Sequence, residues 1–183
     1  HKLLSVASVQ SIILEKVVFQ SKDDFEEILK IFANKGIHAW VNCPRPLYPI
    51  YREVKNLIKG FDRFFACFHG GNWGLACNSI HFIDLFSFLT DEYSWNIQSL
   101  LDQEVVSEKR IPFVEYKGRV EGYSDKGYRF ILTDHHDLQT PAALQIHTER
   151  HSFLIIESSG YGNVFYSSNE MNWEWKQKKI EIP

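Results

Sequence analysis

Hydrophobic and polar positions follow two different periods in the first third of the chain. Residues 11–20 are apolar and rich in β-branched side chains, a pattern that predicts a buried strand. Apolar residues then recur at helical spacing from Phe25 to Phe32. Ser21 before this stretch has the character of an N-cap, and Gly36 after it favours termination. A strand followed by an amphipathic helix is therefore predicted.

The same alternation continues up to residue 89. Short apolar runs at 37–41 and 64–68 predict two further strands. Helical spacing at 47–58 and 73–89 predicts two further helices. Strands and helices that alternate in this way are typical of α/β layers.

The pattern changes in the second half of the chain. We predict a helix at 94–108 and a short helix at 140–146, while the other segments have the composition of short strands separated by turn residues. These strand-like segments are 113–116, 128–133, 153–157, 164–167 and 173–182. The prediction is one compact α+β domain over 1–183 with an antiparallel β meander in its second half. A subdivision into an α/β part (1–109) and an antiparallel part (110–183) is the alternative.

Composition narrows the functional classes. With 44% apolar and 23% charged residues, the 183-residue chain has the balance of a folded globular protein. Its net charge of −3 does not favour direct binding to nucleic acid. We find no apolar run long enough for a membrane helix. The odd number of cysteines, three, argues against a disulfide framework, so we expect a cytoplasmic protein.

A glycine-containing turn, Phe68-His69-Gly70-Gly71-Asn72-Trp73, follows a predicted strand. It resembles the oxyanion-hole turn of lipase-like α/β-hydrolases, which implies backbone N–H groups facing a developing alkoxide. Those enzymes also need a nucleophile elbow with the pattern GxSxG. The nearest segment, Glu157-Ser158-Ser159-Gly160, lacks the leading glycine.

The segments Ser21–Asp24 and Gly70–Ala76 together resemble barstar-like immunity proteins. In that family a strand and a helix precede a tight turn, and the helix after the turn enters the active site of a ribonuclease. Gly74 stands where the family has an aspartate. The resemblance therefore implies an acidic binding edge supplied instead by Asp84, Asp91 and Glu92.

The segment Thr133-Asp134-His135-His136 resembles the metal-binding motif of DHH-type phosphoesterases. His147 and His151 stand four residues apart, so on a helix both imidazoles would lie on one face. The two histidine pairs together resemble the compact His-Me nuclease fingers. This alternative implies a small metal-dependent nuclease or phosphoesterase whose catalytic cluster is Asp134, His135, His136, His147 and His151. Manganese or zinc would be held by the first four.

A second nuclease-like pattern is Glu115-Tyr116-Lys117 on a predicted strand, with Asp102 upstream. A carboxylate followed by E-x-K is the skeleton of restriction-type nucleases, in which two acids hold Mg²⁺ and the lysine steadies the attacking water.

Between these alternatives, the acidic charge and the many aromatic residues favour a binding protein over an enzyme. We interpret the chain as a non-catalytic immunity-type inhibitor that covers the active site of a bacterial toxin, with a ribonuclease as first candidate. Its partner would be a basic toxin domain, with no membrane and no direct nucleic acid. The interpretation includes no metal, no cofactor and no catalytic residue. Its binding residues would be Asn72, Trp73, Asp84, Asp91 and Glu92.

Overall fold

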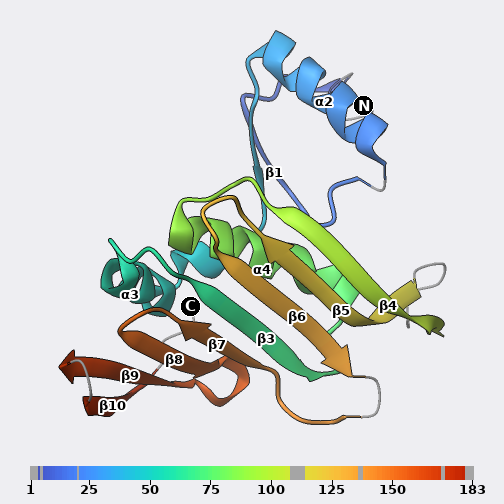
Figure 1. Ribbon diagram of the computed structural model, residues 1–183. Helices are drawn as coiled ribbons and strands as arrows, with labels where there is room; N and C mark the ends of the chain where they lie inside the picture. Colours follow the sequence, from blue (N-terminus) through green and yellow to red (C-terminus); the bar gives the residue numbers. More distant parts are fainter. Residues whose placement is uncertain are drawn as a thin grey trace. The chain divides into compact units, whose positions relative to one another are not determined.

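The computed structural model describes residues 4, 6–19, 21–107, 114–135, 138–169 and 172–179. Contacts between residues divide the chain into two compact units, His1–Cys43 and Pro44–Pro183. Each unit has its own hydrophobic core. Figure 1 traces the chain through both units. Among the described residues, every helix is too short or too polar to serve as a transmembrane span.

The first unit is a strand–helix–strand segment made of β1 (Ser11–Leu14), α2 (Lys22–Lys35) and β2 (His38–Val41). The two strands pair in parallel, with Ser11 opposite His38. Helix α2 covers one face of the pair, where Ile28 and Phe32 are buried. The predicted helix is therefore confirmed, whereas β1 is shorter than the apolar run that predicted it.

Both ends of α2 form as the sequence predicts. The Ser21 hydroxyl oxygen accepts a hydrogen bond from the Asp24 N–H at 3.1 Å. This bond satisfies one of the N–H groups that the first turn of a helix leaves unpaired. At the other end Gly36 adopts φ +64°, a left-handed conformation that glycine reaches without steric cost.

The second unit contains two α-helices and an eight-stranded sheet in its described part. Its elements in chain order are η1 (Arg45–Leu47), α3 (Pro49–Ile58), β3 (Phe65–Gly71), α4 (Leu75–Thr90), β4 (Asn96–Ser107), β5 (Val114–Tyr123), β6 (Arg129–His135), β7 (Ala143–His147), β8 (His151–Ile156), η2 (Glu157–Ser159), β9 (Tyr161–Asn169) and β10 (Asn172–Lys179).

Strand β3 lies in the middle of this sheet, and two antiparallel meanders flank it (Figure 1). The strand order is β10-β9-β8-β7-β3-β6-β5-β4. β3 pairs in parallel with β6 and antiparallel with β7, and the remaining pairs are antiparallel. The α+β class is thus confirmed, with strand–helix alternation first and antiparallel strands afterwards.

The helix predicted at 94–108 is wrong, because this segment forms strand β4. The apolar residues Ile97, Leu100 and Leu101 fit helical spacing, but Ile97 and Leu101 also fit the alternation of a strand. Pairing with β5 extends from Asn96 to Ser107 around an irregular stretch between Leu101 and Val105. This long tertiary pairing overrides the local pattern.

The short helix predicted at 140–146 is also wrong. Residues 143–147 form β7, an internal strand that pairs with both β3 and β8. Leu144 and Ile146 are fully buried on one face of it. Alanine, leucine and glutamine favour a helix, but the free energy of this preference is small. Hydrogen bonding of β7 to two neighbouring strands outweighs it.

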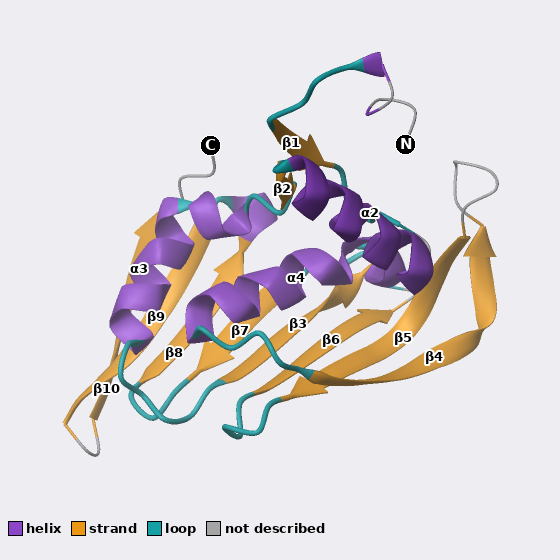
Figure 2. Cartoon of the chain, turned by 90° about the horizontal axis from the view of Figure 1, so that it is seen from above, coloured by secondary structure: helices purple, strands orange, loops and turns teal. Residues whose placement is uncertain are grey.

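The helices α3 and α4 both lie over the same face of the sheet (Figure 2). Alternate residues of the central strands, among them Phe68, Leu132 and Leu144, point into the core beneath these helices. From the helices, Val54, Leu85 and other buried residues complete it. The sheet therefore has a helix-covered face and an opposite face that neither helix covers.

An ion pair fixes the chain entering α3 to the far meander. The Arg45 guanidinium donates two hydrogen bonds to the Glu157 carboxylate, at 2.9 and 2.8 Å. The hydroxyl of Tyr51 donates a third, at 2.5 Å. Burial and the neighbouring carboxylate raise the pKa of Tyr51 well above its usual value. The guanidinium also lies 4.3 Å from the ring centroid of Phe82 on α4.

Replacing Glu157 by alanine should lower the free energy of unfolding by about 2 kcal/mol, because a partly buried guanidinium and a buried phenol then lose their acceptor. Urea denaturation measures the change. The matched control is Asp91→Asn, which removes one charge of the exposed Lys55–Asp91 pair and should cost less than about 1 kcal/mol. Equal losses in the two variants would contradict a structural role for the Arg45–Glu157 pair.

Candidate functional site

The turn between β3 and α4 is a tightly constrained backbone segment of the second unit. A Cβ atom added at Gly71 would lie 1.8 Å from the Leu138 carbonyl oxygen, so only glycine fits there. Gly74 has φ +83° and directly precedes α4, a conformation that disfavours other residues. The glycines that suggested an active-site turn are therefore required by packing and by backbone geometry.

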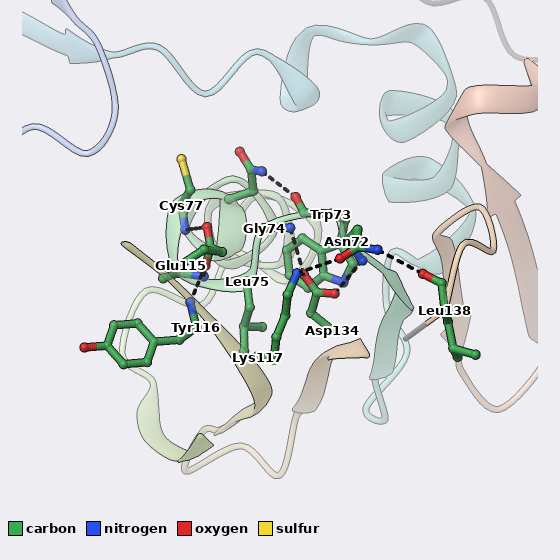
Figure 3. A network of polar contacts seen from close by, with 12 residues as sticks. Asn72, Trp73, Gly74, Leu75, Cys77, Glu115, Tyr116, Lys117, Asp134 and Leu138 are labelled. Carbon is green, nitrogen blue, oxygen red and sulfur yellow. Dashed lines mark hydrogen bonds and ion pairs between the residues drawn. The ribbon is translucent and has the colours of Figure 1, made fainter. Parts of the chain in front are cut away.

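Asp134 on β6 holds this turn from below (Figure 3). Its buried carboxylate accepts hydrogen bonds from the N–H groups of Asn72, at 2.7 Å, and Gly74, at 2.8 Å. The buried ammonium group of Lys117 on β5 lies 3.2 Å from the same carboxylate. Lys117 also donates to the Asn72 side-chain oxygen at 3.2 Å. These contacts compensate the cost of burying the two charges.

Glu115, two residues before Lys117 on β5, reaches the start of α4 (Figure 3). Its buried carboxylate accepts hydrogen bonds from the N–H groups of Ala76 and Cys77. It also accepts one from the N–H of Tyr116, at 3.0 Å. A negative charge at this position is favoured by the unpaired N–H groups and the dipole of the helix.

The two carboxylates therefore fill the anion-binding position that a strand–turn–helix segment offers. Four N–H groups around the turn, from Asn72 to Cys77, donate to Asp134 or Glu115. These four N–H groups are therefore not available to a developing alkoxide. The E-x-K pattern likewise forms structural contacts here, because Glu115 caps α4 and Lys117 pairs with Asp134.

The structure separates the residues of the metal-site alternative. Asp134 and His135 are neighbours on β6, so their side chains point to opposite faces of the sheet. His147 lies on β7, where its Nδ1 is 3.0 Å from the Ser152 hydroxyl. His151 is on β8 and stacks on Phe153, and burial lowers the pKa of both His147 and His151. His136 falls outside the described residues.

Within the described part of the chain, no group of three or more histidine, cysteine, aspartate or glutamate residues has the arrangement of a metal site. His147 and His151 are on adjacent strands rather than on one helix face. Asp134, which would supply the carboxylate ligand, already binds Lys117 and two N–H groups.

Four of the five residues expected to bind a partner lie at opposite ends of α4, a helix about 24 Å long. At its start, the Trp73 indole donates to the Thr133 carbonyl at 2.7 Å and packs against Phe68. At its end, Asp91 pairs with Lys55 and Glu92 pairs with Lys126.

Asp84 is half-buried on α4 between these ends, and burial raises the pKa of its carboxyl group. Cys77, His81 and Asp84 recur at i, i+4 and i+7, so they form one stripe along α4. This stripe is separate from the fully buried positions Leu75, Leu85 and Phe86. Sequence reasoning named Asp84 but missed His81, although the spacing on an apolar helix was the available signal.

One cavity lies at the end of α4 and a second lies beside the first residues of β3 and β6. One, of about 230 Å³, is lined by Lys59, Arg63 and Thr90 among others. The second, of about 580 Å³, is lined by Arg63, Arg129 and His147 among others. Of the site residues predicted from the sequence, Asp91 borders the first cavity and His147 the second.

Neither the family models nor the sequences of curated proteins give a match to this chain. Solved structures, by contrast, do match this chain. A dehydrogenase (MviM) from Clostridium difficile has a TM-score of 0.66 at 18% identity, over 92% of this chain and 55% of that protein. A putative NADPH-dependent oxidoreductase from Desulfitobacterium hafniense has a TM-score of 0.70 at 13% identity, over 93% and 58%.

The super-repressor mutant of Gal80p from Saccharomyces cerevisiae has a TM-score of 0.68 at 14% identity, over 93% of this chain and 53% of that protein. The likeness shows the fold alone. The chain spans just over half the length of the three proteins.

The resemblance to barstar-like inhibitors is wrong. The fold matches proteins described as a dehydrogenase and as a putative NADPH-dependent oxidoreductase over more than 90% of the chain. The turn and helix that carried the resemblance are held by Asp134 and Glu115 inside the protein. The interpretation as a toxin inhibitor is therefore also wrong. So is the expectation of no cofactor, since these neighbours include a protein described as NADPH-dependent.

The polar turn predicts unequal effects of two substitutions. Asp134→Ala leaves two N–H groups and a buried ammonium without their acceptor, so it should lower the free energy of unfolding by about 3–5 kcal/mol. Lys117→Met should cost less, because the carboxylate keeps both backbone donors. Urea denaturation followed by circular dichroism measures both losses. A larger loss for Lys117→Met than for Asp134→Ala would contradict the assigned role of Asp134.

Proposed function

We propose that this chain is part of an NAD(P)-linked oxidoreductase that acts on a hydroxyl or carbonyl compound. The observation that carries the proposal is the fold match, which extends over more than 90% of the chain to proteins described as a dehydrogenase and as an NADPH-dependent oxidoreductase. Fold does not fix function, so the argument turns on what the residues of this chain can do.

The described residues do not themselves fit a dinucleotide. Such a cofactor places its pyrophosphate at a glycine turn between a parallel strand and a helix, where free N–H groups receive it. The β3–α4 turn has this form, but Asp134 and Glu115 occupy its N–H groups and would repel an anion. At the start of α2, Ser21 caps the helix and Asp23 and Asp24 add negative charge.

The start of α3 and the glycine pair Gly160 and Gly162 do not fit a dinucleotide either. α3 follows the short helix η1 rather than a strand. Gly160 and Gly162 lie at the start of β9, and no helix follows them in the described residues. The nucleotide of the proposed enzyme is therefore held by protein outside the described residues.

The structure of the first unit gives a reason to expect further nucleotide-binding protein beside it. Its two strands form a parallel pair, although parallel sheets are normally larger and covered on both faces. Helix α2 covers one face, while Ile13 and Trp40 on the other are 73% and 56% exposed. A parallel strand pair with one bare apolar face has the construction of a border of a nucleotide-binding sheet, whose helices flank both faces.

His81 is the residue of this chain that we assign to substrate chemistry. The nucleotide would carry the hydride chemistry, so the chain has to bind the substrate and exchange the proton of its hydroxyl group. An imidazole is well suited to that exchange near neutral pH. His81 lies on the partly exposed stripe of α4, one turn from Asp84, on a helix whose start is fixed by Glu115 and Asp134.

The nucleotide assignment is tested by fluorescence titration with NADH and NADPH. The native protein, isolated from its source with whatever further chain or subunit accompanies this one, should bind one of them saturably. The 183-residue chain alone should bind neither. Failure of the native protein to bind either nucleotide would overturn the proposed function, while binding by the chain alone would overturn the fit argument.

The role of His81 is tested in the same native protein by His81→Ala. Nucleotide affinity should stay unchanged, and kcat should fall by about 10²- to 10⁴-fold because proton transfer loses its acceptor. Added imidazole should restore part of the rate, which a merely structural defect would not allow. Asp91→Asn, at the far end of the same helix, is the control and should keep full activity. Full kcat in His81→Ala would remove His81 from the chemistry.

If the native protein binds nucleotide but turns over no hydroxyl or carbonyl compound, the chain serves regulation rather than catalysis. That outcome would contradict the enzymatic part of the proposal and leave its nucleotide part standing.

A further inference from the structure

The larger cavity, of about 580 Å³, lies where β3 and β6 begin and β7 ends. Its lining includes Arg63, Phe65, Arg129 and His147. Phe65 pairs with Arg129 on β6 and with His147 on β7, and paired residues point to the same side of a sheet. The Arg129 N–H donates to the Phe64 carbonyl oxygen at 3.0 Å, which holds the segment before β3 against β6. Side chains from three strands and from this segment therefore meet at one cavity.

The two arginines of this cavity have hydrogen-bond donors to spare. In the part of the chain that the structure describes, neither Arg63 nor Arg129 forms an ion pair, and both are exposed. Lys126, the third cation of the lining, is instead paired with Glu92 at 3.2 Å. A guanidinium presents a planar fork of N–H groups that binds two oxygens of a phosphate or carboxylate at once. Two such groups at one cavity favour a ligand with a doubly charged anionic group.

The charge around the cavity supports an anionic ligand. The smaller cavity, of about 230 Å³, shares Arg63 and Thr148 with it. The two linings together contain five lysine and arginine residues and three aspartate and glutamate residues. The whole chain has the opposite balance, with 20 basic and 23 acidic residues. A concave region of positive charge on a negative protein raises the local concentration of anions.

Two carboxylates in the same lining restrict the rest of the ligand. They belong to Asp62 and Glu149. An ionised carboxylate accepts hydrogen bonds from hydroxyl groups, and it repels a second anionic group. The cavity therefore suits a ligand with one anionic group and with hydroxyl groups on its remaining part.

An aromatic surface completes the cavity. The Phe65 ring is 36% exposed and stacks on the His147 imidazole, with ring centroids 6.1 Å apart and planes 21° apart. The Ser152 hydroxyl lies 3.0 Å from Nδ1 of His147, so Nε2 is the ring nitrogen left to contact a ligand. Aromatic rings with a few polar groups, in a volume of about 300–1,000 Å³, are the usual construction of a small-molecule site.

We propose that this cavity binds a monophosphate of a small polyhydroxy compound, such as a sugar phosphate. The phosphate group lies between Arg63 and Arg129. Asp62 and Glu149 accept hydrogen bonds from the hydroxyl groups, and the carbon skeleton packs on Phe65. The cavity shares no residue with the β3–α4 turn or with the stripe of α4 assigned to substrate chemistry. The proposal therefore does not depend on the proposed oxidoreductase function.

Isothermal titration calorimetry of the full chain, without nucleotide, tests the ligand class with four probes. Glucose 6-phosphate should bind saturably. Inorganic phosphate should bind about 10-fold more weakly, because it lacks the hydroxyl groups that the carboxylates accept. Glucose should give no detectable binding at the same concentrations. Glucose 1,6-bisphosphate should bind more weakly than glucose 6-phosphate, because its second phosphate meets the carboxylates of Asp62 and Glu149.

Absence of saturable binding by glucose 6-phosphate would overturn the proposal. Equal affinity for inorganic phosphate would reduce the cavity to a general anion site and contradict the ligand class. Tighter binding of the bisphosphate would contradict the role given to the two carboxylates.

Three arginine variants test the location of the site with the same titration of glucose 6-phosphate. Arg63→Gln and Arg129→Gln should each weaken binding by about 10- to 100-fold, because the phosphate loses a charged two-pronged donor. Arg119→Gln is the matched control, since it makes the same change at a partly exposed arginine of β5 outside the lining. Its affinity should equal that of the wild type, and circular dichroism checks that all three variants are folded.

Unchanged affinity in both Arg63→Gln and Arg129→Gln would place the ligand elsewhere and overturn the proposal. An equal loss in Arg119→Gln would also overturn it, because binding would then follow net charge rather than this cavity.

Discussion

Two buried carboxylates under the start of α4 determine the arrangement of the second unit. Asp134 and Glu115 come from adjacent strands of the sheet. Their carboxylates accept hydrogen bonds from backbone N–H groups on both sides of the β3–α4 junction. An unpaired carboxylate in this position would be costly, and an unpaired set of N–H groups would be costly as well. Each compensates the other, so the sheet and α4 are fixed in one relative position. The hydrophobic core and the stripe with His81 both depend on that position.

The local elements were largely predictable from the sequence, and the long-range pairing was not. The caps of α2 at Ser21 and Gly36 depend on neighbouring residues, and they formed as predicted. The segments of β4 and β7 have patterns that also suit a helix, and their pairing with distant strands decided their structure. Those strand neighbours cannot be read from a local window of sequence.

At the candidate site, the residues were predictable from the sequence and their chemistry was not. Sequence reasoning found Asp134, Glu115 and the glycine turn, but it assigned them to metal, nuclease or inhibitor chemistry. The chemistry of a carboxylate depends on what it faces, and here the partners are Lys117 and backbone N–H groups distant in the sequence. The proposed function uses two different surfaces: the stripe of α4 for substrate, and the bare face of the first unit for a larger parallel sheet.

The most direct test of the central claim, that these carboxylates already occupy the anion position, is an NMR titration of the backbone amides. The account predicts that the ¹⁵N–¹H signals of Asn72, Gly74, Ala76 and Cys77 do not move when inorganic pyrophosphate is added to the full chain. Saturable shifts confined to these four amides would contradict it, because the turn would then be an open anion site.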